Sequence, residues 1–331
     1  LIPAELVNNL GIVGVGVSQD WSVVNPAPGV YDWTNLDLRI AQAKAAGFKI
    51  NLVITISSEK TPAWLLDDSL PVNPVRIDLV DPSSQHLAFC SPVKTCLYWD
   101  PVFHQARLDL IAAAGAHFNS DPEIIAVTAA FANQHSNDFN VLDNIFLPGA
   151  ELQCPSCPTV PPQLCGPQIM DQPAQWLAAG WTEQKMAQTG KEIMDAYAAA
   201  FPNKNIKLPI GGMKSSLMSK LTPPGIDGTY STLARDIEDY VYGNASLGIP
   251  AQPYANRFYM QRNTLNASWQ FGTIFDDGLP PDFDSDNYIR DIIRQNAKSV
   301  ELGGPTPGQA GHRMVAPATR GMNRRRTGGG D

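Results

Sequence analysis

Strand-like and helix-like segments alternate along most of this 331-residue chain. The strand-like segments are short apolar runs, and the helix-like ones repeat apolar residues at helical spacing. Strands are predicted at residues 11–18, 48–57, 124–132, 206–213 and 257–265, with a sixth at 312–318. Helices are predicted at residues 34–47, 99–118, 182–201, 231–243 and 285–299. This order implies a parallel sheet covered by helices.

Capping residues support several of the predicted helix ends. Asp100 and Pro101 suit the N-cap and the first position of one helix, and Thr182 suits the N-cap of another. Gly47 suits the end of the first helix, where a residue in the left-handed conformation closes the last turn.

Two architectures compete for such a sheet. A doubly wound sheet needs a glycine-rich phosphate loop, and residues 14–17 (GVGV) supply only half of that motif. A (β/α)8 TIM barrel instead carries polar loops after its strands, because its active site forms there. Polar residues follow the strands here, at 19–21, 57–60, 133–135 and 261–263. The sequence therefore predicts an α/β barrel and no cofactor.

A single domain is predicted for residues 1–331, because neither a linker nor a repeat divides the chain. About six strands are visible against the eight of a full barrel, so a barrel incomplete at one or both ends is expected. The chain begins at Leu1 without an initiator Met or a signal peptide, which predicts a removed leader or a fragment.

The composition disfavours two kinds of partner. Lys and Arg number 24 against 32 Asp and Glu, and the net charge of −8 disfavours nucleic acid, whose phosphates need a basic face. No stretch approaches the ~20 apolar residues that span a bilayer, so no membrane segment is predicted.

The chain contains five cysteines, Cys90, Cys96, Cys154, Cys157 and Cys165. A zinc site needs four ligands at suitable spacing, and no second CxxC pair exists, so no metal is predicted. Disulfides that staple the loops at 57–99 and 140–180 are favoured, with Cys90–Cys96 first and one of the other three left over. Sequons at Asn244 and Asn266 are compatible with export, and a secreted or periplasmic protein is expected.

Residues 20–54 resemble a recurrent segment of retaining glycoside hydrolases with barrel folds, the clan that includes β-galactosidases and cellulases. In that segment a strand ends in a Trp, here Trp21, and a Pro-Gly turn follows at 28–29. An aromatic-Asp-Trp then opens a helix, here at 31–33. Residues 62–68, 99–127 and 198–210 are also similar to that clan. The resemblance implies a barrel that acts on carbohydrate.

Aromatic residues of these segments have two possible roles. Tyr31 and Trp33 are expected to fill the seam between helix and barrel, while Gly29 permits the turn before them. Trp21, Trp64 and Trp99 stand at strand ends or in loops. For each of these three, a sugar-stacking platform and a loop-packing anchor remain open.

The resemblance also implies two catalytic carboxyl groups, which lie about 5–5.5 Å apart in retaining enzymes. The clan's acid/base Glu directly follows an Asn at the end of strand four. Here Asn133 matches the Asn, but the next residue is Gln134, whose amide is no carboxylic acid. Three alternatives follow. Asp138 or Glu151 substitutes as the acid, Gln134 replaces a Glu by engineering, or the chain binds sugar without cleaving it.

The second carboxylate is assigned to Glu301, although a helix end before a Gly-Gly turn explains that residue equally well. Asp138 has its own alternative as a solvated loop residue. His135 either orients a carboxyl group, binds a sugar hydroxyl or caps the loop. The predicted substrate-binding residues are Asp20, Trp21, Trp64, Trp99, Asn133, Gln134, His135, Gln261 and Asn263.

The leading hypothesis is therefore a glycoside hydrolase that acts on a polysaccharide or oligosaccharide through carboxylates at the barrel rim. The alternative is a carbohydrate-binding barrel without catalysis, in which Gln134 takes the place of the acid. A dehydrogenase is disfavoured because the phosphate loop is absent.

Overall fold

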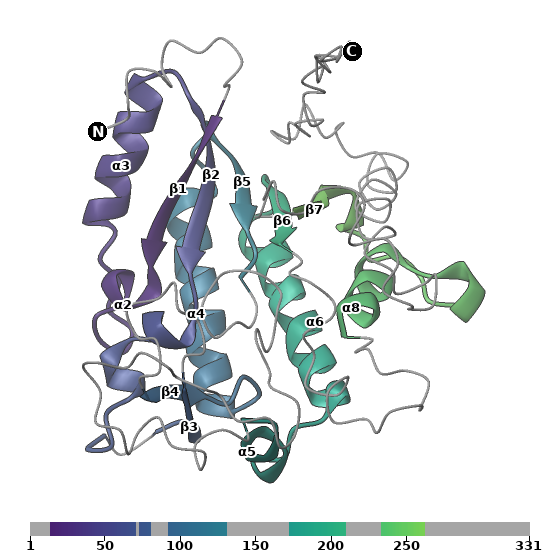
Figure 1. Cartoon of the computed structure of the whole chain (residues 1–331). Coiled ribbons are helices and arrows are strands. Elements are labelled where there is room, and N and C mark those ends of the chain that lie inside the picture. Colours follow the sequence, from purple (N-terminus) through teal and green to yellow (C-terminus); the bar gives the residue numbers. More distant parts are fainter. Residues whose placement is uncertain (1–13, 71–72, 81–91, 131–171, 210–232, 262–331) are drawn as a thin grey trace, which may run out of the picture.

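A computed structural model describes residues 14–70, 73–80, 92–130, 172–209 and 233–261 of the chain. Five parallel strands form one sheet in the order β1-β2-β5-β6-β7 (Figure 1). Their bounds are Gly14–Asp20, Lys49–Thr55, Ile124–Thr128, Asn205–Pro209 and Phe258–Gln261. These five correspond to the first five strands predicted from the sequence.

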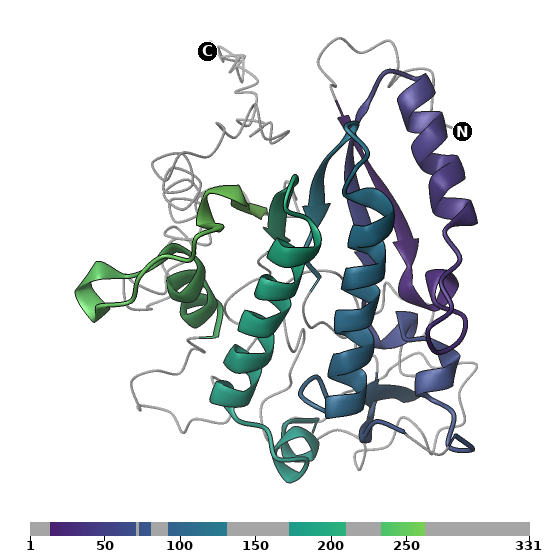
Figure 2. The ribbon, with the colours of Figure 1, turned by 180° about the vertical axis from the view of Figure 1, so that it is seen from behind.

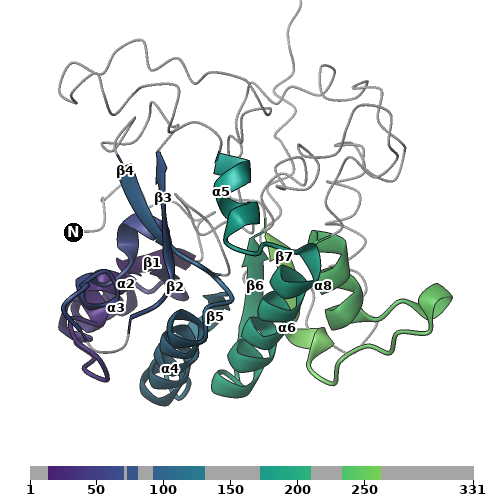
Figure 3. The same cartoon turned by 90° about the horizontal axis from the view of Figure 1, so that it is seen from below.

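Four longer helices alternate with these strands: α3 (Thr34–Ala45), α4 (Pro101–Phe118), α6 (Glu183–Ala200) and α8 (Leu233–Tyr242). Seen from behind, α4 and α6 lie side by side across the sheet (Figure 2). Seen from below, the strands follow a curve with the four helices on its convex side (Figure 3). The described residues therefore form part of a (β/α)8 barrel, which confirms the predicted fold class.

The predicted caps set the ends of three helices. Asp100 accepts hydrogen bonds from the backbone N–H groups of Val102 (2.9 Å) and Phe103 (3.1 Å) at the start of α4. Thr182 accepts one from the Lys185 N–H at 3.1 Å at the start of α6. Gly47, just after α3, has a φ of 80°. These residues satisfy backbone groups that a helix end leaves unpaired.

Alternate residues of the strands face opposite layers. In β2, Leu52 and Ile54 are buried among side chains of α4 and α6. Asn51 and Val53 therefore point to the concave side, because successive strand residues alternate between faces. In β6, Ile206 is likewise fully buried in the core. The core thus lies between the sheet and its helices.

The segment 57–99, expected to be irregular, contains an antiparallel hairpin. Its strands β3 (Arg76–Val80) and β4 (Pro92–Cys96) pair with each other, and the hairpin lies at the end of the sheet toward which the strands run (Figure 1). The short helix α5 (Gln172–Ala178), inside the predicted loop 140–180, contacts β3. Both segments contain several prolines, which interrupt the apolar patterns from which short elements are predicted.

The predicted Cys90–Cys96 disulfide is wrong, because Cys96 is a free thiol. It is 1% exposed, and its Sγ lies 3.9 Å from the Leu65 carbonyl oxygen. Burial raises the pKa of this thiol to about 12, so it stays protonated. Cys90 and the other three cysteines lie outside the described residues, as do the predicted helix at 285–299 and strand at 312–318.

No helix in the part of the chain that the structure describes has the length and apolarity to cross a membrane.

A tight contact between α4 and α6 generates a stability prediction. A Cβ atom added at Gly115 would lie 2.7 Å from the Cβ of Ala200 and would also overlap its backbone. We expect Gly115→Ala to lower the free energy of unfolding by about 1–3 kcal/mol, as overpacking does. Urea denaturation measures the change. Gly16→Ala is the control, since a Cβ there meets nothing within 4 Å. Equal denaturation midpoints for both variants would contradict the close packing.

Candidate functional site

The carboxyl ends of the parallel strands meet at one edge of the sheet, where barrel enzymes place their active sites. β1 ends at Asp20, and β2 is followed by the 3-10 turn η1 (Ser58–Lys60). Lys60 Nζ lies 3.1 Å from Asp20 Oδ2, and both side chains remain about a third exposed, at 36% and 35%. This ion pair joins two neighbouring strand ends and stays open to solvent.

A polar row crosses the concave face below that edge. Asn51 Nδ2 donates to Thr128 Oγ1 at 3.0 Å, which links β2 to β5. Thr128 pairs in register with Lys207, and Lys207 pairs with Tyr259. Because residues in register point the same way, these side chains share the concave face. Hydroxyl, amide and amine groups therefore lie on this face, although Thr128 is 4% exposed and Tyr259 is fully buried.

Lys207 is the unusual member of this row. Burial lowers the pKa of its amine to about 8, and no described carboxylate offsets the effect. A substantial neutral fraction of this lysine therefore exists in mildly alkaline solution, unlike an ordinary surface lysine. Burial also raises the pKa of Tyr259, to about 12, so its hydroxyl keeps its proton.

Two helices hold the backbone where β5 leads toward Asn133 and Gln134. Arg107 of α4 donates from Nη2 to the Ala130 carbonyl oxygen at 3.1 Å. The Ala130 N–H donates to the Tyr197 hydroxyl of α6 at 3.3 Å. Arg107 is fully buried, and burial lowers its pKa to about 10. Both backbone polar groups of Ala130 are thus hydrogen-bonded to the helices, four residues before the predicted acid/base position.

Most of the predicted site lies beyond the described ranges. The catalytic candidates Asp138, Glu151 and Glu301 fall there, and their roles stay predictions. The same holds for Asn133, Gln134, His135 and Asn263. The backbone of Gln261 ends β7, paired with Pro209, at the edge where the predicted rim lies.

The three tryptophans with open roles differ in their surroundings. Trp21 is fully buried and donates from its indole N–H to Asn25 Oδ1 at 3.1 Å, so packing rather than sugar stacking describes its role in this structure. Trp99 packs against Trp176 and Trp181, with ring centroids 5.9 Å apart in both cases. Trp64 is partly buried and lines a surface pocket.

Several residues of this region were not predicted as site residues from the sequence. Lys207 and Tyr259 alternate with core residues in their strands, and that alternation is the sequence signal for a second polar face. Arg107 and Tyr197 sit inside ordinary helical patterns, and nothing in their spacing marks them. Among the described residues, no group of three or more His, Cys, Asp and Glu side chains is arranged to hold a metal ion.

The lowered pKa of Lys207 predicts a pH-dependent stability difference. Its folded pKa is about 8 and its ordinary value is 10.5. The cost of burying the ammonium group is therefore fully present below about pH 8 and disappears as the pH rises toward the ordinary value. We expect Lys207→Met to stabilise the protein at neutral pH by roughly 1–2 kcal/mol, and by less at about pH 10.

Urea denaturation at both pH values measures this difference. Lys49→Met serves as the control, because Lys49 is exposed beside Glu123 at 2.6 Å. A Lys207→Met effect of the same size at both pH values would contradict a desolvated amine.

The hydrogen bond between the Ala130 N–H and the Tyr197 hydroxyl gives a second prediction. Tyr197→Phe removes the acceptor of its buried N–H, and leaving such a group unpaired costs about 1–3 kcal/mol. Thermal or urea denaturation should show that loss. Tyr240→Phe is the control, because the Tyr240 hydroxyl donates to Asp195 in a partly exposed setting at 2.8 Å. If the two variants lose equal stability, the buried hydrogen bond to Ala130 contributes no more to the free energy of unfolding than the partly exposed one.

Comparison with known proteins finds one matching family model and several similar folds. Residues 5–138 match the model of glycoside hydrolase family 42, described as beta-galactosidase. No curated protein sequence matches the chain. The catalytic domain of beta-amylase from Paenibacillus polymyxa is 12% identical with a TM-score of 0.50, and the match covers 91% of this chain and 79% of that one.

Matches of lower structural similarity include endo-glycoceramidase II from Rhodococcus sp., in its cellobiose-like imidazole complex (17% identity, TM-score 0.33). That match covers 60% of this chain and 41% of the endo-glycoceramidase chain, so this chain spans less than half of that protein. Beta-galactosidase from Bacillus circulans sp. alkalophilus is 14% identical with a TM-score of 0.37, over 63% of this chain and 33% of that one. By its family-model match and by its fold, the chain is similar to the glycoside hydrolases of the (β/α)8-barrel clan.

Proposed function

We propose that this protein hydrolyses O-glycosidic bonds of a polysaccharide or oligosaccharide at the carboxyl ends of its parallel strands. The observation that carries the proposal is the polar concave face of a curved parallel sheet, inside a chain whose residues 5–138 match a beta-galactosidase family model. Sugar recognition needs a few convergent polar groups, and Asn51, Lys207 and the Asp20–Lys60 pair are the candidates among the described residues.

Hydrolysis requires two carboxyl groups, one that protonates the leaving oxygen and one that acts as nucleophile or activates water. Asp138, Glu151 and Glu301 are the proposed carriers of these roles. A retaining mechanism would need two of them about 5–5.5 Å apart, and an inverting one about 6.5–9.5 Å apart. The hydrogen bonds from Arg107 and to Tyr197 hold the Ala130 backbone. They support the proposal, because the segment that leads to Gln134 and Asp138 starts from this defined position.

The concave face supplies the proposed binding groups. Lys207 and Thr128 lie in register on neighbouring strands, and both present groups that bond to sugar hydroxyls. Asp20 is held beside Lys60 and adds a carboxylate at the same edge.

Gln134 favours a second candidate function, a barrel that binds carbohydrate without cleaving it. The amide at this position can hydrogen-bond a sugar but cannot donate a proton as a carboxylic acid does. In this case the polar concave face would bind the glycan, and no catalytic carboxylate would be needed.

Export from the cytoplasm is also part of the proposal, and the sequons support it. The described sequon has a structural use as well, since Asn244 accepts a hydrogen bond from the Ser246 N–H at 3.2 Å and donates to Asp239 at 3.0 Å. Asn244 thereby caps the 3-10 turn η5 (Ala245–Leu247).

Turnover of a panel of aryl glycosides and soluble polysaccharides tests the enzyme proposal. We expect the wild-type protein to release sugar from at least one substrate, and Asp138→Asn to lower kcat by about 10²–10⁴-fold, the contribution of a general acid. Asp37→Asn, on the outer helix α3, is the control and should keep full activity. Full activity of Asp138→Asn would remove Asp138 from the mechanism.

The variant Gln134→Glu separates the two candidate functions. If the wild-type protein binds glycans without turnover and Gln134→Glu gains hydrolysis, the binding barrel is supported. If neither protein binds or cleaves any carbohydrate of the panel, both candidate functions fail.

A further inference from the structure

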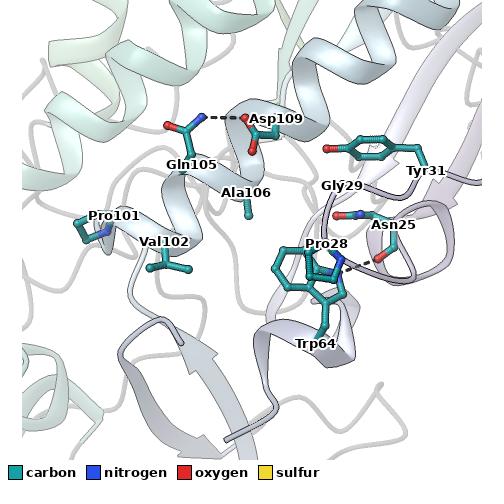
Figure 4. A pocket seen from close by; sticks show the side chains of 10 residues that line it. All are labelled: Asn25, Pro28, Gly29, Tyr31, Trp64, Pro101, Val102, Gln105, Ala106 and Asp109. Atoms are coloured by element: carbon teal, nitrogen blue, oxygen red, sulfur yellow. Dashed lines mark hydrogen bonds between the residues drawn. The ribbon is translucent and has the colours of Figure 1, made fainter. Parts of the chain in front are cut away.

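A pocket of about 420 Å³ lies on the helix-covered side of the sheet (Figure 4). Its walls come from the connection between α2 (Trp21–Val24) and α3, from Trp64, and from the first half of α4. None of its lining residues in the described part of the chain belongs to a strand, so it is separate from the concave face described above. Its volume falls within the ~300–1,000 Å³ typical of small-molecule sites.

One wall of this outer pocket is aromatic and rigid. The Tyr31 ring stacks on Trp33 with centroids 5.7 Å apart and planes 4° from parallel. Trp33 in turn stacks on His117 at 5.6 Å. Trp33 thus supports the Tyr31 ring, and Tyr31 itself lines the pocket. An aromatic ring held in this way offers an apolar surface on which the C–H face of a sugar ring can pack.

The opposite wall comes from α4, where Gln105 and Asp109 add a polar pair to the apolar residues Pro101, Val102 and Ala106. Gln105 Nε2 donates to Asp109 Oδ1 at 2.8 Å, and both side chains are exposed. In Figure 4 the hydroxyl end of Tyr31 points toward Asp109. Burial and the Asp109 carboxylate both raise the pKa of Tyr31, which agrees with this approach. Carboxylate, amide and phenol groups thus face a single space.

The loop between these walls is held by a single side chain. The Asn25 side chain donates from Nδ2 to the carbonyl oxygens of Ala27 (2.8 Å) and Val30 (2.9 Å), and the Asn25 backbone carbonyl oxygen accepts the indole N–H of Trp64 at 3.0 Å. Gly29 in this loop has a φ of 69°, and a Cβ there would meet nothing within 4 Å. The pocket is therefore largely pre-formed, which lowers the entropy lost on binding.

We propose that the outer pocket is a second carbohydrate-binding site, which holds a sugar ring of a neutral glycan between Tyr31 and the Gln105–Asp109 pair. A sugar ring matches both walls, because its C–H face packs on an aromatic ring while its hydroxyl groups bond to amide and carboxylate oxygens. A phosphate or other anion does not fit, because Asp109 is the only charged group among the described residues that line the pocket. The inference does not depend on catalysis at the strand ends.

Such a site would keep a long glycan near the protein. Binding at a second point raises the effective concentration of the chain at the first. The outer pocket should therefore strengthen binding to polymers and leave short substrates unaffected.

Native affinity electrophoresis through gels that contain a galactan, a mannan, a xylan, a β-glucan or starch tests the proposal. We expect at least one polysaccharide to retard the wild-type protein. Tyr31→Ala should weaken that binding by about tenfold, and Gln105→Ala by a few fold. Tyr31→Phe keeps the ring and should retain most of the affinity, which separates loss of the aromatic surface from loss of the hydroxyl.

Gln188→Ala is the matched control. Gln188 of α6 donates to Glu192 at 2.8 Å in the same i, i+4 arrangement, on a different helix from the one that lines the outer pocket. Circular dichroism of Tyr31→Ala checks that the fold is intact, and Gln105→Ala tests the pocket through an exposed side chain alone. Absence of retardation by every polysaccharide, or equal retardation of the wild-type protein and both pocket variants, would overturn the second site.

The outcome is separate from that of the proposed function. Turnover of aryl glycosides should be the same in the wild-type protein and in Gln105→Ala. If turnover is absent but the pocket variants still lose polysaccharide binding, the enzyme proposal fails and the second site stands. If turnover is present and the pocket variants bind as the wild-type protein does, the second site fails and the enzyme proposal stands.

Discussion

Burial of alternate strand residues against the helices is the constraint on which this structure depends. Leu52, Val127 and Ile206 are almost completely buried in that layer. Since neighbouring side chains of a strand point to opposite faces, this burial forces Asn51, Thr128 and their neighbours onto the concave side. A shift of one residue in any strand would expose apolar side chains and bury polar ones. The polar concave face is thus a consequence of how the core is built.

The helices also set the strand ends. Arg107 and Tyr197 come from α4 and α6, and together they hydrogen-bond both backbone polar groups of Ala130. A buried guanidinium is costly unless its donors find acceptors, and the Ala130 carbonyl is one acceptor that meets this need. The same two side chains therefore stabilise the helix–sheet contact and position the segment that leads to Asn133 and Gln134.

The segment that carries the family resemblance has a use beyond the core. Tyr31 and Trp33 were expected to fill the seam between helix and barrel, and they are half-buried there, packed against the core cluster. Their stacking leaves part of Tyr31 available to the outer pocket. A single aromatic pair thus contributes to packing on one side and to a candidate binding surface on the other.

The amino-acid sequence by itself determined the parallel α/β architecture, five strand positions and the caps at Asp100 and Thr182. These features depend on local periodicity and on hydrogen bonds between residues close in the chain. Only the tertiary structure decided that Cys96 is a free buried thiol, that Trp21 lies in the core, and that Lys207 shares a face with Thr128. Burial and cross-strand register depend on residues far apart in sequence, and no local pattern encodes them.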